Sequence, residues 1–61
     1  MSMRKYYVKV TALDTGASKE FNFKAYGWEH LKEKTTKHLE NHEKQWYNRH
    51  NRKVSFQMEK L

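Results

Sequence analysis

The chain has 61 residues, and 13 Lys and Arg against 7 Asp and Glu give it a formal net charge of +6. A chain this short supports one domain with a thin core, and the absence of cysteine excludes disulfides and thiolate zinc sites. No apolar run is long enough for a signal peptide or a membrane span. The positive charge creates a field that attracts nucleic acid, anionic membrane surfaces or acidic proteins. We expect a partner other than a membrane, and a cytoplasmic protein, or a nuclear one if the source is eukaryotic.

The first half of the chain predicts a β-hairpin. Residues 5–13 and 19–26 alternate between apolar and polar side chains, which is the period of a half-buried strand. Asp14 and Gly16 lie between the two runs. They favour a turn, because glycine tolerates positive φ and aspartate can bond nearby backbone.

The apolar faces of these strands suggest a register. If Asp14 pairs with Lys19 across a four-residue loop, Val10 lies opposite Phe23 and the apolar faces coincide. On the opposite face, the same register pairs Tyr7 with Tyr26 and Lys9 with Lys24.

Residues 28–49 predict one long helix, because apolar residues recur at spacings of three and four. We expect Trp28 and Leu39 to anchor the core, Trp46 to join them, and Tyr47 to be exposed. The stripe consists of Trp28, Leu31, Thr35, Leu39, His42 and Trp46.

Residues 53–60 alternate again and predict a third strand, with Val54, Phe56 and Met58 pointing inward. The element order is therefore ββαβ. A right-handed crossover from the second strand to the third passes over the first. The sequence thus predicts a single α+β domain over residues 1–61, with a three-stranded antiparallel sheet of order 2-1-3 and the helix on one face.

The stretch from Asp14 to Ala17 resembles the active-site loop of retroviral aspartic proteases. Such a protease needs two of these loops so that two carboxylates share a proton, and this family also needs flaps and a second structural motif. The chain has no residues left for those parts, so Asp14 is expected to be a turn residue. With no cysteine nucleophile, phosphate-cradling glycine loop or credible carboxylate pair, we expect no enzymatic activity and no cofactor.

His38 and His42 have the i, i+4 spacing that can chelate a metal on a helix. No third ligand is placed beside them by the sequence. We therefore expect no metal site, with His42 packed under the sheet and His38 at its border.

The segment from Lys44 to Lys53 is basic, contains no acid and includes interleaved aromatic and amide side chains. Such a composition is typical of surfaces that contact phosphate and bases. The segment predicts a DNA- or RNA-binding surface. Lys37 and Lys44 each follow a glutamate by four residues, so an ion pair along the helix can neutralise their charges. The candidate contacts are Lys44, Tyr47, Asn48, Arg49, Arg52 and Lys53, with Lys9 and Lys24 assisting from the sheet.

The uncovered sheet face leaves a second function open. Tyr7 and Tyr26 could form an interface with a protein, since tyrosine is favoured at binding hot spots. The chain would then be an inhibitor or adaptor, of the small type found in phages and mobile elements. It would dock on an acidic partner, or dimerise through the open face or the edge strands.

Overall fold

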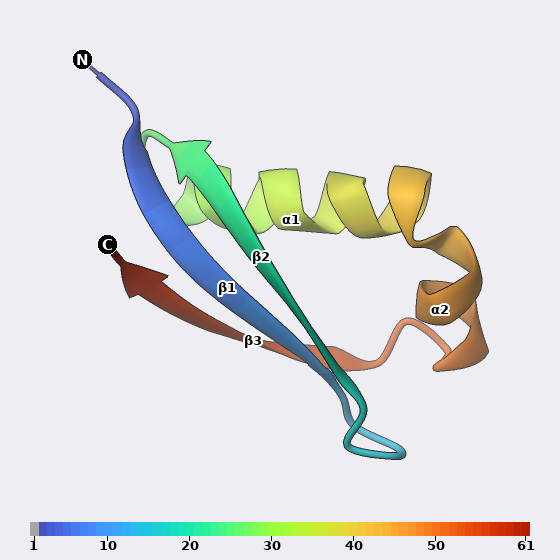
Figure 1. Ribbon diagram of the computed structural model, residues 1–61. Helices are drawn as coiled ribbons and strands as arrows, with labels where there is room; N and C mark the ends of the chain where they lie inside the picture. The colour runs from blue at the N-terminus through green and yellow to red at the C-terminus, as the bar shows by residue number, and fades with distance from the viewer. Residues whose placement is uncertain (1) are drawn as a thin grey trace.

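The computed structural model describes residues 2–61 and shows a small α+β domain with an open three-stranded sheet (Figure 1). The strand order is β2-β1-β3 and both pairings are antiparallel, which confirms the predicted fold class. The elements are β1 (Arg4–Ala12), β2 (Ser18–Ala25), α1 (Trp28–His42), α2 (Lys44–Arg49) and β3 (Val54–Lys60). Neither helix within residues 2–61 is long and apolar enough to cross a membrane.

The predicted hairpin register is wrong, although the predicted faces are right. Val10 lies opposite Lys19 rather than Phe23. The turn closes at Ala12, whose N–H donates to the carbonyl of Ala17 at 2.7 Å and whose carbonyl accepts from Gly16 at 2.9 Å. Gly16 has a φ of 78°, a left-handed conformation that suits glycine. The register is displaced by an even number of residues, so every side chain keeps its face.

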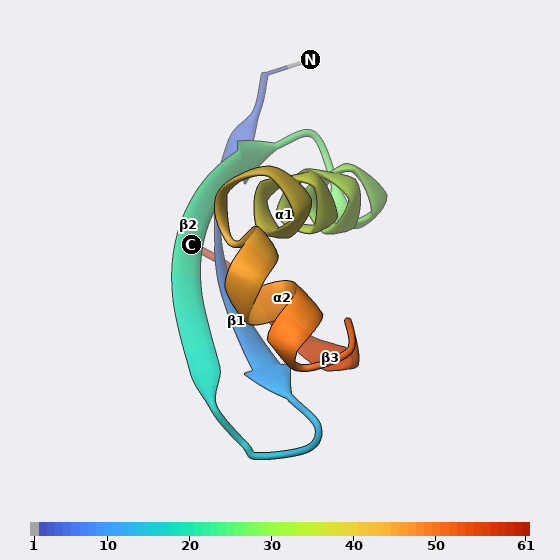
Figure 2. The ribbon, with the colours of Figure 1, turned by 90° about the vertical axis from the view of Figure 1, so that its right-hand side faces the viewer.

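The core lies between the inner sheet face and the two helices, which cover the same side of the sheet (Figure 2). Leu39 is fully buried as predicted, whereas Trp28 is 51% exposed and its ring packs edge-to-face against that of Tyr6. Trp28 is therefore not the expected anchor. The buried hydrophobic cluster consists of Tyr6, Val8, Val10, Ala25, Leu31, Leu39 and Tyr47.

The helix predicted over residues 28–49 is divided in two at Glu43. The φ and ψ of Glu43, −126° and 32°, lie outside the helical region, and α2 turns away from the axis of α1 (Figure 2). The break changes which side chains face the core. Tyr47 is buried at 9% exposure, Trp46 is half-buried, and His42, expected under the sheet, is exposed.

Candidate nucleic-acid interface

The basic residues of the predicted site lie on α2 and on the turn that follows it. Five of the predicted contacts are exposed there, and α2 has no acid in its first turn. Tyr47 is not among them, because its ring is in the core. We call this set the α2 basic surface: Lys44, Asn48, Arg49, Arg52 and Lys53.

The turn after α2 is built from two consecutive residues with left-handed backbone. Asn51 and Arg52 have φ values of 56° and 57°. The Arg52 N–H donates to the carbonyl of Tyr47 at 2.9 Å, and the Lys53 N–H donates to that of His50 at 3.1 Å. Asparagine tolerates this conformation, but a long side chain such as arginine adopts it at a cost of about 1–3 kcal/mol. The surrounding contacts therefore hold Arg52 in a backbone conformation that is unfavourable for an isolated arginine.

The side chain of Arg52 is oriented by two neighbours. Its Nε donates to Oδ1 of Asn48 at 3.1 Å, and its guanidinium lies over the Tyr47 ring, 5.6 Å from the ring centroid. Arg52 forms no ion pair with any carboxylate of residues 2–61. Its remaining N–H groups are thus presented to solvent from a fixed position, which suits bidentate recognition of phosphate.

The other cations near α2 are only partly compensated. Lys37 forms the predicted i, i+4 ion pair with Glu33, at 3.5 Å. The corresponding pair between Glu40 and Lys44 does not form, because α1 ends at His42 and the two residues lie on different helices. Lys44 therefore keeps its charge available.

His50 and Asp14 form a contact that the sequence did not indicate. His50 is 7% exposed, and its Nδ1 lies 2.8 Å from Oδ1 of Asp14. The Trp46 ring packs against the imidazole at a centroid distance of 5.0 Å. Asp14 is thus more than a turn residue: it joins the β1–β2 turn to the end of α2. The two residues are far apart in the chain and belong to no common motif, so sequence reasoning had no signal for the pair.

This contact changes the acidity of Asp14. Partial desolvation acts to raise the pKa of its carboxyl group, but the hydrogen bond and positive charge of His50 prevail and lower it. Because the pKa of the Asp14 carboxyl group is lower in the folded state than in the unfolded state, the ionised carboxylate stabilises the fold. The full stabilisation is present at pH values above the unfolded pKa of about 3.9. The stabilisation is lost as the pH falls from the unfolded pKa through the lower pKa of the folded state.

We therefore expect Asp14→Asn to be less stable than the parent at pH 7 and at pH 5, with the difference shrinking as the pH falls to 3. Urea denaturation of both proteins at the three pH values measures it. Glu40→Gln, which neutralises an exposed carboxylate outside any ion pair of the described residues, is the control and should show little difference at any pH. Superimposable midpoints for the parent and Asp14→Asn at every pH would contradict the role of the pair.

The open sheet face does not bring the other predicted site residues together. Lys9 lies opposite Glu20, and Tyr7 lies opposite Asn22 rather than Tyr26. Partial desolvation of its hydroxyl, followed by the negative charges of Glu20 and Glu59, raises the pKa of Tyr7. Acids and bases thus alternate on this face, so it is a weaker phosphate surface than the register predicted from sequence suggested.

Lys24 and Tyr26 lie at the end of β2, away from Lys9 and Tyr7. Lys24 is exposed and pairs with Lys5 across the ladder, and its carbonyl accepts a hydrogen bond from Nζ of Lys34. Tyr26 follows the strand and is 55% exposed. Its ring stacks on that of His30 at 5.3 Å, and its N–H donates to Nδ1 of the same residue at 3.0 Å.

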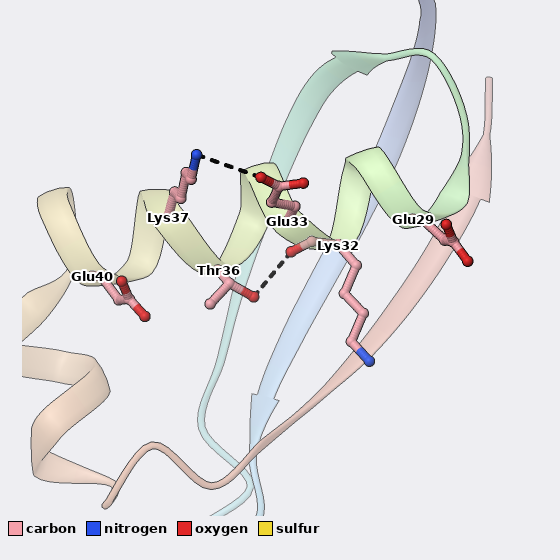
Figure 3. A pocket seen from close by; sticks show the side chains of 6 residues that line it. All are labelled: Glu29, Lys32, Glu33, Thr36, Lys37 and Glu40. Atoms are coloured by element: carbon pink, nitrogen blue, oxygen red, sulfur yellow. Dashed lines mark hydrogen bonds and ion pairs between the residues drawn. The ribbon is translucent and has the colours of Figure 1, made fainter.

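The outer face of α1 carries a shallow hollow of about 470 Å³ (Figure 3). Three glutamates and two lysines line it, so acids outnumber bases by one, and Lys37 forms an ion pair with Glu33. This mixture offers no preference for an anionic ligand. The lining residues are Glu29, Lys32, Glu33, Thr36, Lys37 and Glu40.

The two helical histidines lie side by side, with ring centroids 5.0 Å apart. His38 packs edge-on against Phe21 at 4.8 Å and Phe23 at 5.4 Å. Over the part of the chain that the structure describes, no three His, Cys, Asp or Glu side chains are grouped so as to hold a metal ion.

Comparison of the chain with protein-family models, with curated proteins and with solved structures finds no match in any of the three. The function is therefore inferred from the geometry of these residues alone.

Proposed function

We propose that this protein binds DNA or RNA through the α2 basic surface and has a binding role rather than a catalytic one. The observation that carries the proposal is the fixed orientation of the exposed Arg52 side chain. Its backbone is left-handed, its guanidinium is oriented by Asn48 and Tyr47, and no carboxylate within residues 2–61 neutralises it. An exposed arginine held in this way suits a phosphate ligand, because little side-chain freedom is lost on binding.

The neighbouring residues extend this contact. Arg49 and Lys53 are exposed on either side of Arg52 in the chain, and the net charge of +6 adds a general attraction for a polyanion. Lys24 and Lys5, paired across the ladder, strengthen the positive field further, whereas the charge of Lys9 is opposed by Glu20. We place this binding in the cytoplasm, the compartment that the cysteine-free composition predicts.

Replacing Arg49, Arg52 and Lys53 together by alanine should flatten the slope of log affinity against log salt by about 2–3 units. Each phosphate contact releases about 0.9 counterions from a duplex and about 0.7 from a single strand. Folding should survive, since charges at a helix end contribute only about 0.3–1 kcal/mol each. The measurement is a salt titration of binding to labelled duplex and single-stranded oligonucleotides, followed by fluorescence anisotropy.

The matched control replaces Arg4, Lys32 and Lys60 by alanine. It removes the same charge from exposed positions outside α2 and its turn. Its slope should change less than that of the α2 variant. Equal slopes in both variants would move the contact away from α2, and no binding by the parent at about 50 mM salt, where electrostatic contacts are strong, would refute nucleic-acid binding altogether.

A second candidate function is binding to an acidic partner protein or to a second copy of the chain. It is favoured by large apolar side chains left at the surface: Tyr26 is 55% exposed and Trp28 is 51% exposed. Aromatic residues of this kind are enriched at the centres of protein interfaces. Stoichiometric binding to one protein, lost on Trp28→Ala, together with no affinity for any oligonucleotide, would establish this function in place of the first.

A further inference from the structure

A row of cationic and ring-bearing side chains runs along the side of α1 that faces β2. His30, Lys34, His38 and His42 recur every four residues and so lie on one side of the helix. Each of the first three is tied to β2 or its end. His30 accepts the N–H of Tyr26, Lys34 donates to the carbonyl of Lys24, and His38 packs on two phenylalanines of the strand. We call these four residues the β2–α1 row.

Two neighbouring hollows follow the end of this row. The first, of about 290 Å³, is lined by Lys34, His38, Asn41 and His42 among others. The second, of about 430 Å³, lies where α1 breaks into α2. Both are lined by Asn41 and His42, so the hollows are adjacent, and we call the two together the groove. At its far end the groove reaches Lys19, Lys44, Trp46 and Arg49.

The charges of this groove differ from those of the hollow in Figure 3. Only one acid, Glu43, lines it, and Lys19 already neutralises that carboxylate at 3.2 Å. The cations Lys44 and Arg49 remain without an ion pair in the described part of the chain. The groove therefore favours a polyanion, whereas the outer face of α1, with three glutamates, does not.

The rings of the groove indicate which polyanion. His42 is exposed and its ring lies 5.0 Å from that of His38, while the half-buried Trp46 lies further along. Histidine and tryptophan rings stack on unpaired bases. The bases of a duplex are already stacked on one another and offer no free face. The amide of Asn41, which lines both hollows, can bond a base edge.

We propose that this groove binds single-stranded nucleic acid, with the phosphates on Lys34, Lys44 and Arg49 and a base stacked on His42. The inference rests on the proposed function, because Lys44 and Arg49 belong both to the groove and to the α2 basic surface. It adds a preference for the single strand over the duplex, and it adds the β2–α1 row to the interface.

The direct test compares His42→Ala with His42→Phe, using a fluorescein-labelled 12-nucleotide oligo-dT and a 12-base-pair duplex as probes. Removing one stacked ring should weaken binding of the single strand about five- to hundredfold. His42→Phe keeps a ring and should restore most of that affinity, and neither variant should change duplex binding appreciably. His42 is exposed, so both variants should fold, which circular dichroism verifies. Gln57→Ala, an exposed neutral position on the open sheet face, is the control.

A second measurement places the strand in the groove. In a Trp28→Phe protein, Trp46 is the only remaining tryptophan, since the chain has 2. Its fluorescence should change on addition of oligo-dT and saturate at the same concentration as the anisotropy. Binding without any change at Trp46 would overturn the groove.

The outcomes separate the two proposals. If His42→Ala binds the single strand as the parent does while the salt slope still depends on Arg49, Arg52 and Lys53, the groove is wrong and the α2 surface stands. If the parent binds neither probe, both fail. Equal losses of single-strand and duplex binding in His42→Ala would also refute a stacking role.

Discussion

Leu39→Ala should lower the free energy of unfolding by about 2–5 kcal/mol, as truncations of buried leucines do. Leu39 is fully buried and lies in the cluster that joins α1 to β1 and α2. Small domains have a total stability of only about 5–15 kcal/mol, often at the lower end of that range. We therefore expect this single change to leave a large fraction of the protein unfolded at 37 °C. Urea or thermal denaturation followed by circular dichroism measures it.

The adjacent residue provides the matched control. Glu40 is exposed on the outer face of α1, and Glu40→Ala should stay within about 0.5 kcal/mol of the parent. If Leu39→Ala melts at the parent's temperature, then α1 packs with a different face than the one described.

Tyr47→Ala should lower the stability by about 3–5 kcal/mol, the range for a large aromatic side chain removed from a core. Tyr47 is 9% exposed, and its ring also supports the guanidinium of Arg52. Tyr47→Phe keeps the ring and should retain most of the stability. Denaturation of the parent and both variants in urea provides the comparison.

The loss of stability in Tyr47→Ala should be compared with that in Trp28→Ala. Trp28 is larger but 51% exposed, so its truncation removes less buried area and should cost less than Tyr47→Ala. The reverse order of stabilities would restore Trp28 as the main anchor and would place Tyr47 at the surface.

The topology and the faces of the strands could be predicted from the sequence, because they depend on a period of two and on a handedness rule. Val8 and Val10 are buried and Phe56 and Met58 face them from β3 as that period requires. The hairpin register was not predictable in the same way. Displacing a strand by an even number of residues keeps the apolar pattern, so only the hydrogen bonds of the turn around Gly16 select among the alternatives.

The helix break and the packing of α2 could not be predicted either. No proline or glycine lies near Glu43, so the local sequence favours a continuous helix. The break coincides with tertiary contacts that a local pattern does not reveal: Glu43 forms an ion pair with Lys19, and Tyr47 is buried. The basic character of the segment after Lys44 was evident from composition. The orientation of Arg52 depends on a left-handed turn that composition does not reveal.

The central position of β1 has a consequence for the order in which the sheet can assemble. Its partner on one side, β2, follows after a short turn, so this hairpin closes a small loop at little entropic cost. Its partner on the other side, β3, lies far from β1 in the sequence, so that Tyr6 pairs with Lys60. That ladder has a high contact order and closes a loop that contains both helices. Until β3 returns, the most apolar strand of the protein has one unpaired edge, and during that interval another chain could pair with it.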